Sequence, residues 1–349
     1  MDILLQPEIM PQLGYLQALG LQANKAAENA IFKLYQDRRP INTQRSQRAA
    51  LKVFADFMQA CGLVVPDLYS DPFSWMGITW GLVQTFQSWL LRQGYSIKTI
   101  NDRVSVVKVY MALANQAGII PDSEILRLQS LRGYTRKEAI DTDAKRIAEG
   151  ITTRKGTKKA AAVAITEDQA RALCKVRNAT PQARRDALMM CLLLYHGLRV
   201  SELSILKIEN IDIEAKQINF YRPKTGKISR HNLGGRRSWQ ILTEYMSKDN
   251  HAQNGPLILA SCKSGSLIPG KGMTTRAIQE RVTQLGQGVD LENLSPHDCR
   301  HYGATQAGND PKVSLVALMS WGGWDSPQSA ARYINRGQAD NDGVSLGIE

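Results

Sequence analysis

The spacing of the apolar residues changes along the chain from a helical to an alternating pattern, and this change limits the possible fold classes. Over residues 43–62 and 96–118, apolar residues recur every three or four positions, which predicts amphipathic helices. Residues 211–220 and 228–233 contain stretches in which apolar and polar residues alternate, with the turn Lys224-Thr225-Gly226-Lys227 between them. This pattern predicts a β-hairpin. The sequence therefore predicts a mainly α-helical protein with a small β-sheet in its second half.

Residues 41–135 are predicted to form one all-α bundle, preceded by a less informative segment of residues 1–40 with a helical pattern over 24–35. Gly62, Gly94 and Gly118 end successive helical patterns. Basic side chains lie off the apolar stripes of these helices and could contact a polyanion: Arg45, Arg48, Lys52, Lys98, Arg103 and Lys108. A solvated helix face is the alternative, and for the first helix alone it is the simpler interpretation.

Residues 136–162 are predicted to form a basic connector between two domains. This segment has little apolar periodicity, contains Gly150 and Gly156, and carries basic residues that include Arg154, Lys155, Lys158 and Lys159. A basic connector could cross a DNA backbone and contact its phosphates. An ordinary solvated linker is the alternative interpretation.

A second domain is predicted over residues 163–336, with mixed α and β structure. Thr166 and Gln169 form a capping-box pattern at its start. The apolar run 187–194 is far shorter than the ~20 residues that span a bilayer, so it predicts a buried helix. Further helical patterns cover 239–246 and 274–285. The fold class predicted for the whole chain is therefore a helical bundle followed by an α+β domain.

The charge of the chain favours a polyanionic partner. Its 349 residues suffice for about two domains, and 44 Lys and Arg against 32 Asp and Glu give a formal net charge of +12. An anionic membrane would attract this charge too, but the basic residues are not concentrated on one amphipathic helix. No secretory signal is evident, and five scattered cysteines without a paired spacing favour reduced thiols in a cytosol over disulfides or a zinc site.

Three segments carry candidate functional residues. Ser295 and Pro296 can begin a helix, which places His297 and Arg300 on one face of its first turn. An imidazole beside a guanidinium can bind a phosphate, because the guanidinium offers paired donors to its oxygens. Another arginine, Arg199, lies at a glycine-marked break between helical patterns. Residues 330–334 are predicted to form a short helix that presents Tyr333 beside an arginine.

This set of residues resembles the tyrosine recombinases, which include the phage integrases and the Cre-type and Xer-type enzymes. The resemblance rests on the box Gly197-Leu198-Arg199-Val200-Ser201-Glu202-Leu203, then His297-x-x-Arg300, then Tyr333, in the family's order. Any one of these motifs alone can occur by chance, but chance is a poor explanation for all of them in this order. The resemblance implies that residues 41–135 are a core-binding DNA-binding domain, that 163–336 are the catalytic domain, and that 337–349 are a C-terminal tail.

The resemblance also implies a role for each residue in cutting and rejoining DNA, with no metal, nucleotide or other cofactor. Tyr333 would attack the scissile phosphate and form a 3′-phosphotyrosyl link, and Arg199 and Arg300 would hold its non-bridging oxygens. His297 would donate to a phosphate oxygen or assist with the tyrosine proton. Lys224 would protonate the leaving 5′-oxygen, with Lys227 as a competing candidate.

Two further residues complete this expected site. Glu202 would orient either Arg199 or His297. Trp324 lies where many relatives have histidine; Cre-type members also have tryptophan there, and its indole N–H can donate a hydrogen bond but cannot transfer a proton. The expected catalytic set is therefore Tyr333, Arg199, Arg300, His297, Lys224, Trp324 and Glu202.

The partners implied are double-stranded DNA, with paired binding sites around a crossover region, and further copies of the chain in a tetramer on that DNA. The resemblance implies a cytoplasmic, nucleoid-associated protein of prokaryotic, phage or plasmid origin, and a tail that docks on a neighbouring subunit. Two other functions stay open at this point. One is nicking and resealing of DNA like a type IB topoisomerase, and the other is DNA-binding regulation with a decayed site.

Overall fold

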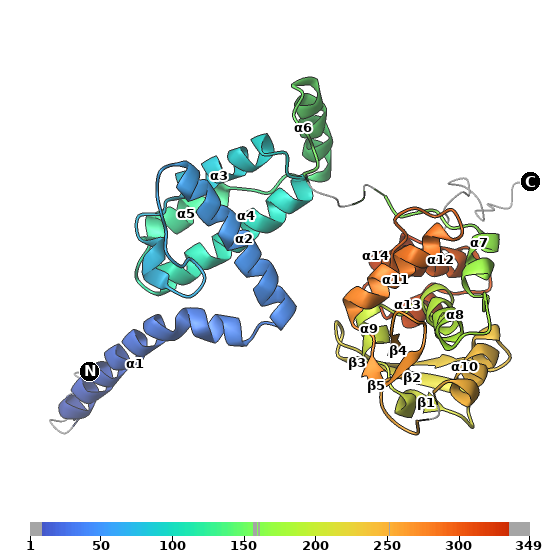
Figure 1. Cartoon of the computed structure of the whole chain (residues 1–349). Coiled ribbons are helices and arrows are strands. Elements are labelled where there is room, and N and C mark those ends of the chain that lie inside the picture. The colour runs from blue at the N-terminus through green and yellow to red at the C-terminus, as the bar shows by residue number, and fades with distance from the viewer. Residues whose placement is uncertain (1–8, 156–158, 160, 251, 335–349) are drawn as a thin grey trace, which may run out of the picture. The chain divides into compact units, whose positions relative to one another are not determined.

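The structure is a computed structural model that describes residues 9–155, 159, 161–250 and 252–334. The chain divides into two compact units, residues 1–158 and 159–349 (Figure 1). The described part of the first unit is helical, and the described strands all belong to the second. The predicted fold class, mainly helical with a small sheet, is confirmed. Within the described residues, none of the helices has both the length and the apolar character needed to cross a membrane.

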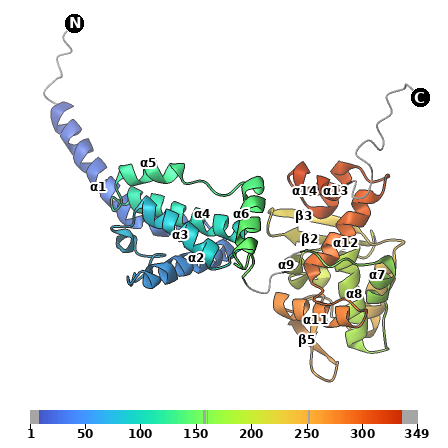
Figure 2. The same cartoon turned by 90° about the horizontal axis from the view of Figure 1, so that it is seen from above.

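In the first unit the helices pack around α4. The elements are α1 (Ile9–Asp37), α2 (Ile41–Ala60), the 3₁₀ helix η1 (Pro72–Trp75), α3 (Trp80–Arg92), α4 (Ile97–Gln116), α5 (Asp122–Ser130) and α6 (Arg136–Ala148). Helix α4 contacts α1, α2, α3, α5 and η1 (Figure 2). Ser96 caps α4 by accepting a hydrogen bond from the backbone N–H of Thr99. The predicted α4 stripe is buried against this core, and α1 is longer than its predicted pattern of residues 24–35.

Helix α6 occupies the first half of the segment predicted to be a connector. Thr135 and Glu138 form a capping box at its start. Its Arg146 side chain is 4% exposed and donates to the carbonyl oxygens of Leu91 (3.0 Å), Tyr95 (3.0 Å) and Thr152 (2.9 Å). The sequence prediction was wrong here because a buried arginine holds the helix, and a single arginine leaves no apolar periodicity to detect.

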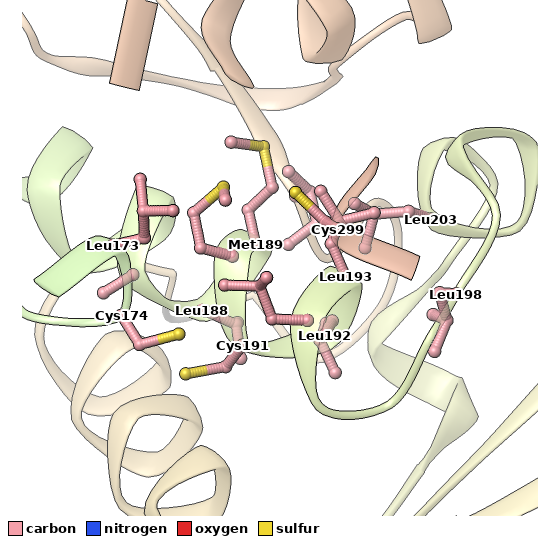
Figure 3. Close-up of a cluster of buried hydrophobic side chains, with 14 of the residues drawn as sticks. Leu173, Cys174, Leu188, Met189, Cys191, Leu192, Leu193, Leu198, Leu203 and Cys299 are labelled. Atoms are coloured by element: carbon pink, nitrogen blue, oxygen red, sulfur yellow. The ribbon is translucent and has the colours of Figure 1, made fainter. Parts of the chain in front are cut away.

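The second unit is built around α8. Its helices are α7 (Glu167–Leu173), α8 (Pro181–Leu194), α9 (Val200–Ser204), η2 (Ile208–Asn210), α10 (Arg237–Lys248), α11 (Thr275–Gln287), α12 (Pro296–Asn309), α13 (Leu315–Gly322) and α14 (Pro327–Ala331). Helix α8 contacts α7, α9, α10 and α12. Figure 3 shows the side chains of α8 with Leu173, Leu203 and Cys299 in this core. The apolar run 187–194 is thus a buried helix, as predicted.

Two small antiparallel sheets complete the second unit. The larger has the order β1-β2-β3, formed by β1 (Ile211–Asp212), β2 (Gln217–Arg222) and β3 (Lys227–Asn232). The smaller pairs β4 (Leu259–Ser261) with β5 (Leu267–Gly272). The predicted hairpin is confirmed, with Arg222 paired to Lys227 at its turn. Alternation along β2 buries Ile218, Phe220 and Arg222 on one face.

The segment that carries Tyr333 differs from its prediction. The short helix α14 ends at Ala331, so Tyr333 lies in the turn that follows, and its backbone N–H donates to the carbonyl oxygen of Ala330 at 3.0 Å. Pro327 and the Ser326 cap position place this helix earlier than residues 330–334, because proline suits the first turn of a helix. The predicted tail, residues 337–349, and Lys158 lie outside the described residues.

We expect Arg146→Ala to loosen α6 from the first unit. The substitution leaves three carbonyl oxygens without their donor, and each unsatisfied buried polar group costs about 1–3 kcal/mol. Hydrogen exchange should then become faster across residues 136–148. Lys145→Ala is the matched control, since Lys145 is the exposed neighbour on the same helix. Equal exchange rates in both variants would contradict this account of how α6 is held.

Candidate active site

The site begins at the break between α8 and α9. Gly197 has a φ of +60°, and a Cβ atom there would lie 2.3 Å from the Trp321 ring, so the turn requires glycine. Arg199 follows as the N-cap residue of α9. Its guanidinium donates to Glu202 Oε1 at 2.7 Å, and its backbone N–H donates to Glu202 Oε2 at 2.8 Å. The sequence left open whether Glu202 orients Arg199 or His297, and in the structure its carboxylate bonds Arg199.

Arg222, which was not among the predicted site residues, also bonds Glu202. Both side chains are fully buried, and the Arg222 guanidinium lies 3.4 Å from the Glu202 carboxylate. Burial lowers the pKa of Arg222, and the nearby charge of Glu202 opposes that shift. Alternation along β2 could have revealed this residue, because Arg222 falls on the same face as Ile218 and Phe220.

Arg300 enters the same region from α12. It is 5% exposed, and its guanidinium donates to the carbonyl oxygens of Gly197 and Gly322. Burial, together with the positive charges of Arg199 and Arg222, lowers the pKa of Arg300 to about 9, although the carboxylate of Glu202 opposes this shift. These electrostatic interactions place Arg199, Arg222, Arg300 and Glu202 in one group, which we call the arginine cluster.

The arginine cluster carries more positive than negative charge. Three guanidinium groups interact with a single carboxylate, that of Glu202. A charge held away from water is costly unless a counter-ion compensates it. An anion with several oxygens would supply that compensation and would match the paired donors of a guanidinium. The cluster is therefore suited to binding an oxyanion such as phosphate.

Tyr333 lies beside the arginine cluster, against Trp324. The Tyr333 side chain is 6% exposed, and its ring stacks on the Trp324 ring with centroids 5.3 Å apart. The His301 ring lies edge-on to the Tyr333 ring, with centroids 5.1 Å apart. The Arg300 guanidinium carbon lies 4.9 Å from the Trp324 ring centroid. Tyr333, Trp324 and Arg300 are therefore adjacent, as the predicted set requires.

Two glycines permit this close packing at the end of α13. A Cβ atom on Gly322 would lie 2.1 Å from the Trp324 ring, and one on Gly323 would lie 2.5 Å from the Arg222 side chain. Gly323 also ends α13 in the left-handed conformation, with a φ of +58°. The Gly322-Gly323 pair therefore brings Trp324 and Arg222 against the same helix end.

Two predicted residues lie outside these contacts. His297, in the first turn of α12, is exposed although Arg300 is buried, so the two side chains have different surroundings despite their spacing. Lys224 is exposed in the β2–β3 turn. Neither side chain has a hydrogen bond or ion pair to the residues that the structure describes. Lys227, the competing candidate, pairs with Asp325 at 2.5 Å.

The hairpin turn and the Trp324 segment border a common groove. The groove lies between β3 and α13, and its lining includes Thr225, Lys227, Trp324 and Asp325. Lys224 precedes Thr225 directly in this turn. The hairpin lysines therefore lie near Trp324 in the fold, although the sequence separates them by about a hundred residues.

Asp298, which lies between His297 and Arg300, has a structural role. Burial alone would raise the pKa of its carboxyl, but hydrogen bonds from Lys159, Ser295 and the backbone of Val163 lower that pKa. Lys159 Nζ lies 2.5 Å from the carboxylate, and the Ser295 hydroxyl donates to it at 2.7 Å. Ser295 and Asp298 thus begin α12 and fix the direction of its first turn.

The remaining residues predicted to bind DNA lie in the first unit and are mostly exposed. Arg45, Lys52 and Arg154 are exposed, and Arg48 lies over the Tyr69 ring. Arg103 and Lys155 both lie over the Tyr95 ring, at 3.9 and 5.0 Å. Lys98 pairs with Asp102, and Lys108 donates to the Leu131 carbonyl oxygen. A role in DNA binding stays a prediction for this set.

No group of three or more His, Cys, Asp and Glu side chains within the described ranges could hold a metal ion. The described cysteines are free thiols. Cys174, Cys191 and Cys299 belong to the buried core of the second unit (Figure 3).

Comparisons with known proteins identify relatives of this chain. The model of the phage integrase family matches residues 164–339. A tyrosine recombinase XerC of Roseiflexus castenholzii is 24% identical over 269 residues, which are 74% of this chain and 72% of that protein. The type 1 fimbriae regulatory protein FimB of Escherichia coli is 36% identical over 145 residues, which are 39% of this chain and 66% of that protein.

Solved structures share the fold. The Tn1549 transposon integrase in complex with transposon right end DNA has a TM-score of 0.59 at 15% identity, covering 90% of this chain and 96% of that one. A lambda integrase tetramer bound to a Holliday junction has a TM-score of 0.60 at 13% identity, covering 92% of this chain and 82% of that one. Since the family model spans half of the sequence and includes Arg199, Arg300 and Tyr333, this chain belongs to the phage integrase family of tyrosine-type site-specific recombinases.

Proposed function

We propose that this protein cuts and rejoins DNA strands through a covalent link between Tyr333 and a 3′-phosphate. The observation that carries the proposal is the position of Tyr333, stacked on Trp324 next to an arginine cluster with excess positive charge. A tyrosine hydroxyl with a pKa of about 10 is a weak nucleophile at neutral pH. The surrounding groups must therefore stabilise the charge that develops on the phosphate.

Arg199 and Arg300 are proposed to bind the two non-bridging oxygens of the scissile phosphate. Arg199 retains access to solvent, with 20% of its side chain exposed. Arg300 uses two N–H groups on carbonyl oxygens, out of the five that a guanidinium offers. Both guanidinium groups are held in place before DNA binds, so little reorganisation is needed as negative charge builds up on the phosphate.

Attack by the Tyr333 oxygen forms the phosphotyrosyl bond and breaks the bond to the 5′-oxygen. Lys224 is proposed to protonate that leaving oxygen from the hairpin turn, and the indole N–H of Trp324 to donate a hydrogen bond to the phosphate. His297 is exposed at the start of α12, where it could donate to a phosphate oxygen. His301 is a second candidate for the tyrosine proton, because its ring contacts Tyr333.

The phosphotyrosyl link allows the reaction to run in reverse with a different strand. It retains the energy of the phosphodiester bond, so a 5′-hydroxyl from a second duplex can attack it and release Tyr333. We propose that strand exchange takes place in a tetramer on two duplexes, which has a precedent in the lambda integrase tetramer on a Holliday junction. The basic residues of the first unit would contact the phosphates of the same DNA.

We expect Tyr333→Phe to abolish covalent attachment to DNA. The substrate is DNA that flanks the gene, nicked so that the strand with the 5′-hydroxyl is lost after cleavage. After denaturation in SDS, the wild type should give a covalent protein–DNA band and the variant none, because phenylalanine lacks the attacking oxygen. Tyr221→Phe is the control, since Tyr221 is an exposed tyrosine of the hairpin.

The same experiment separates the alternative functions. Salt-sensitive binding of the DNA without a covalent band in the wild type would favour a regulator with a decayed site. A band that persists in Tyr333→Phe would disprove the proposed nucleophile. Relaxation of supercoiled DNA without exchange between two duplexes would favour the topoisomerase-like activity.

We expect Lys224→Ala to slow cleavage by roughly 10²- to 10⁴-fold, the usual contribution of a general acid. A substrate with sulfur in place of the bridging 5′-oxygen should recover most of the rate, because a thiolate leaves without being protonated. Lys227→Ala is the matched control in the same turn, since Lys227 pairs with Asp325. If Lys227→Ala shows the loss and the sulfur rescue instead, the general acid is Lys227.

We propose that residues 337–349, which lie outside the described part of the chain, dock on a neighbouring subunit. Their removal should weaken assembly of the tetramer on DNA, as measured by analytical ultracentrifugation, and leave cleavage of a single site intact. Unchanged assembly of the truncated protein would disprove this role of the tail.

A further inference from the structure

Arg222 is a fully buried arginine whose partners come from three other elements. It ends β2, two residues before Lys224. Its guanidinium approaches Glu202 of α9 at 3.4 Å and donates to the hydroxyl of Ser229 on β3 at 2.5 Å. It also donates to the carbonyl oxygens of Trp321 (2.8 Å) and Gly322 (3.2 Å) at the end of α13. Arg222 therefore connects the hairpin with α9 and α13.

The end of α13 is a favourable place for these donors. The last carbonyl oxygens of a helix have no partner within the helix, and the negative end of the helix dipole favours a cation. The Gly322 carbonyl oxygen accepts hydrogen bonds from both Arg222 and Arg300. Gly323 has no Cβ atom, so the Arg222 side chain can lie against this helix end. The positions of the two arginines are thereby tied to the same carbonyl group.

Glu202 connects Arg222 to the proposed phosphate-binding residues in a similar way. The Glu202 carboxylate accepts hydrogen bonds from Arg199 and lies against Arg222 on its other side. Trp324 follows the α13 end directly, and Tyr333 stacks on Trp324. The Arg222 guanidinium thus lies between Glu202, which bonds Arg199, and the segment that carries Trp324 and Tyr333.

We propose that Arg222 is a positioning residue that sets the distance between Arg199 and the Trp324–Tyr333 segment. This inference rests on the proposed function, because it assigns Arg222 to the same reaction. Arg222 has no exposed surface, so it acts through Glu202 and the α13 carbonyl groups and does not bind phosphate itself. Its place beside the Lys224 turn means that it also fixes where the hairpin meets α13.

Loss of this guanidinium should affect cleavage more than DNA binding. Without it, the end of α13 loses two donors and Glu202 loses one cation. Trp324 and Tyr333 would then shift relative to Arg199, and a displacement of about 1 Å can reduce a rate by roughly 10²-fold. Lysine is a poor substitute, because one ammonium cannot reproduce the planar fork that reaches several acceptors.

The test compares Arg222→Lys and Arg222→Met with Arg185→Lys and Arg185→Met in the full chain. Arg185 is the matched control, because it is also fully buried in the second unit. It bonds Asp186, the Leu259 carbonyl oxygen and the Met273 sulfur, and no residue of the arginine cluster. Each variant is measured for thermal unfolding, for DNA affinity at one salt concentration, and for the single-turnover rate of covalent complex formation at saturating DNA.

We expect the Arg222 variants to form the covalent complex roughly 10²-fold more slowly at saturating DNA, with DNA affinity retained. The Arg185 variants should keep the wild-type rate at temperatures where they are folded. If the rate falls in both pairs in proportion to the loss of thermal stability, Arg222 has only a structural role and the inference is wrong.

A second measurement does not depend on cleavage. In protein labelled with 5-fluorotryptophan, the fluorine resonance of Trp324, assigned with Trp324→Phe, should move in the Arg222 variants and stay in place in the Arg185 variants. An unchanged Trp324 resonance in the Arg222 variants would overturn the inference. If the wild type itself forms no covalent complex, the proposed function fails, and this resonance still decides whether Arg222 positions Trp324.

Discussion

The candidate site depends on the pairing of the buried Glu202 carboxylate with its neighbouring arginines. A carboxylate in a protein interior is unfavourable unless cations and hydrogen bonds compensate it. Glu202 is compensated by Arg199 from its own helix and by Arg222 from the hairpin. Because Arg222 and Arg300 share the Gly322 carbonyl oxygen, this one carboxylate links four elements of the second unit.

The arginine cluster is arranged for binding an anion at some expense of stability. One carboxylate cannot balance three guanidinium groups, and burial together with the charges of Arg199 and Arg222 lowers the pKa of Arg300 to about 9. A lowered pKa means that the folded protein disfavours this charge, so the bare cluster reduces stability at neutral pH. Under the proposed function, a bound DNA phosphate would remove this cost and would stabilise the ordered site.

In both units, buried arginines donate hydrogen bonds to backbone carbonyl oxygens near the C-terminal ends of helices. Arg146 donates to the carbonyl oxygens of Leu91, near the end of α3, and of Tyr95 and Thr152. Arg222 and Arg300 do the same at the end of α13. In each case a long, planar side chain reaches carbonyl oxygens of another element. These contacts hold α6 and the end of α13 that precedes Trp324.

The sequence by itself determined the mainly helical fold class, the hairpin and the buried helix 187–194, because periodicity and turn signals are local properties. The catalytic set with Arg199, His297, Arg300 and Tyr333 came from motif order and stays a prediction. Only the tertiary structure decided that α6 is a helix, that Tyr333 follows α14 as a turn, and that Arg222 joins the cluster. These depend on hydrogen bonds between residues far apart in sequence, such as Arg222 and Gly322. Such bonds leave no periodic pattern: alternation along β2 places Arg222 on the buried face, but only the structure shows its partners.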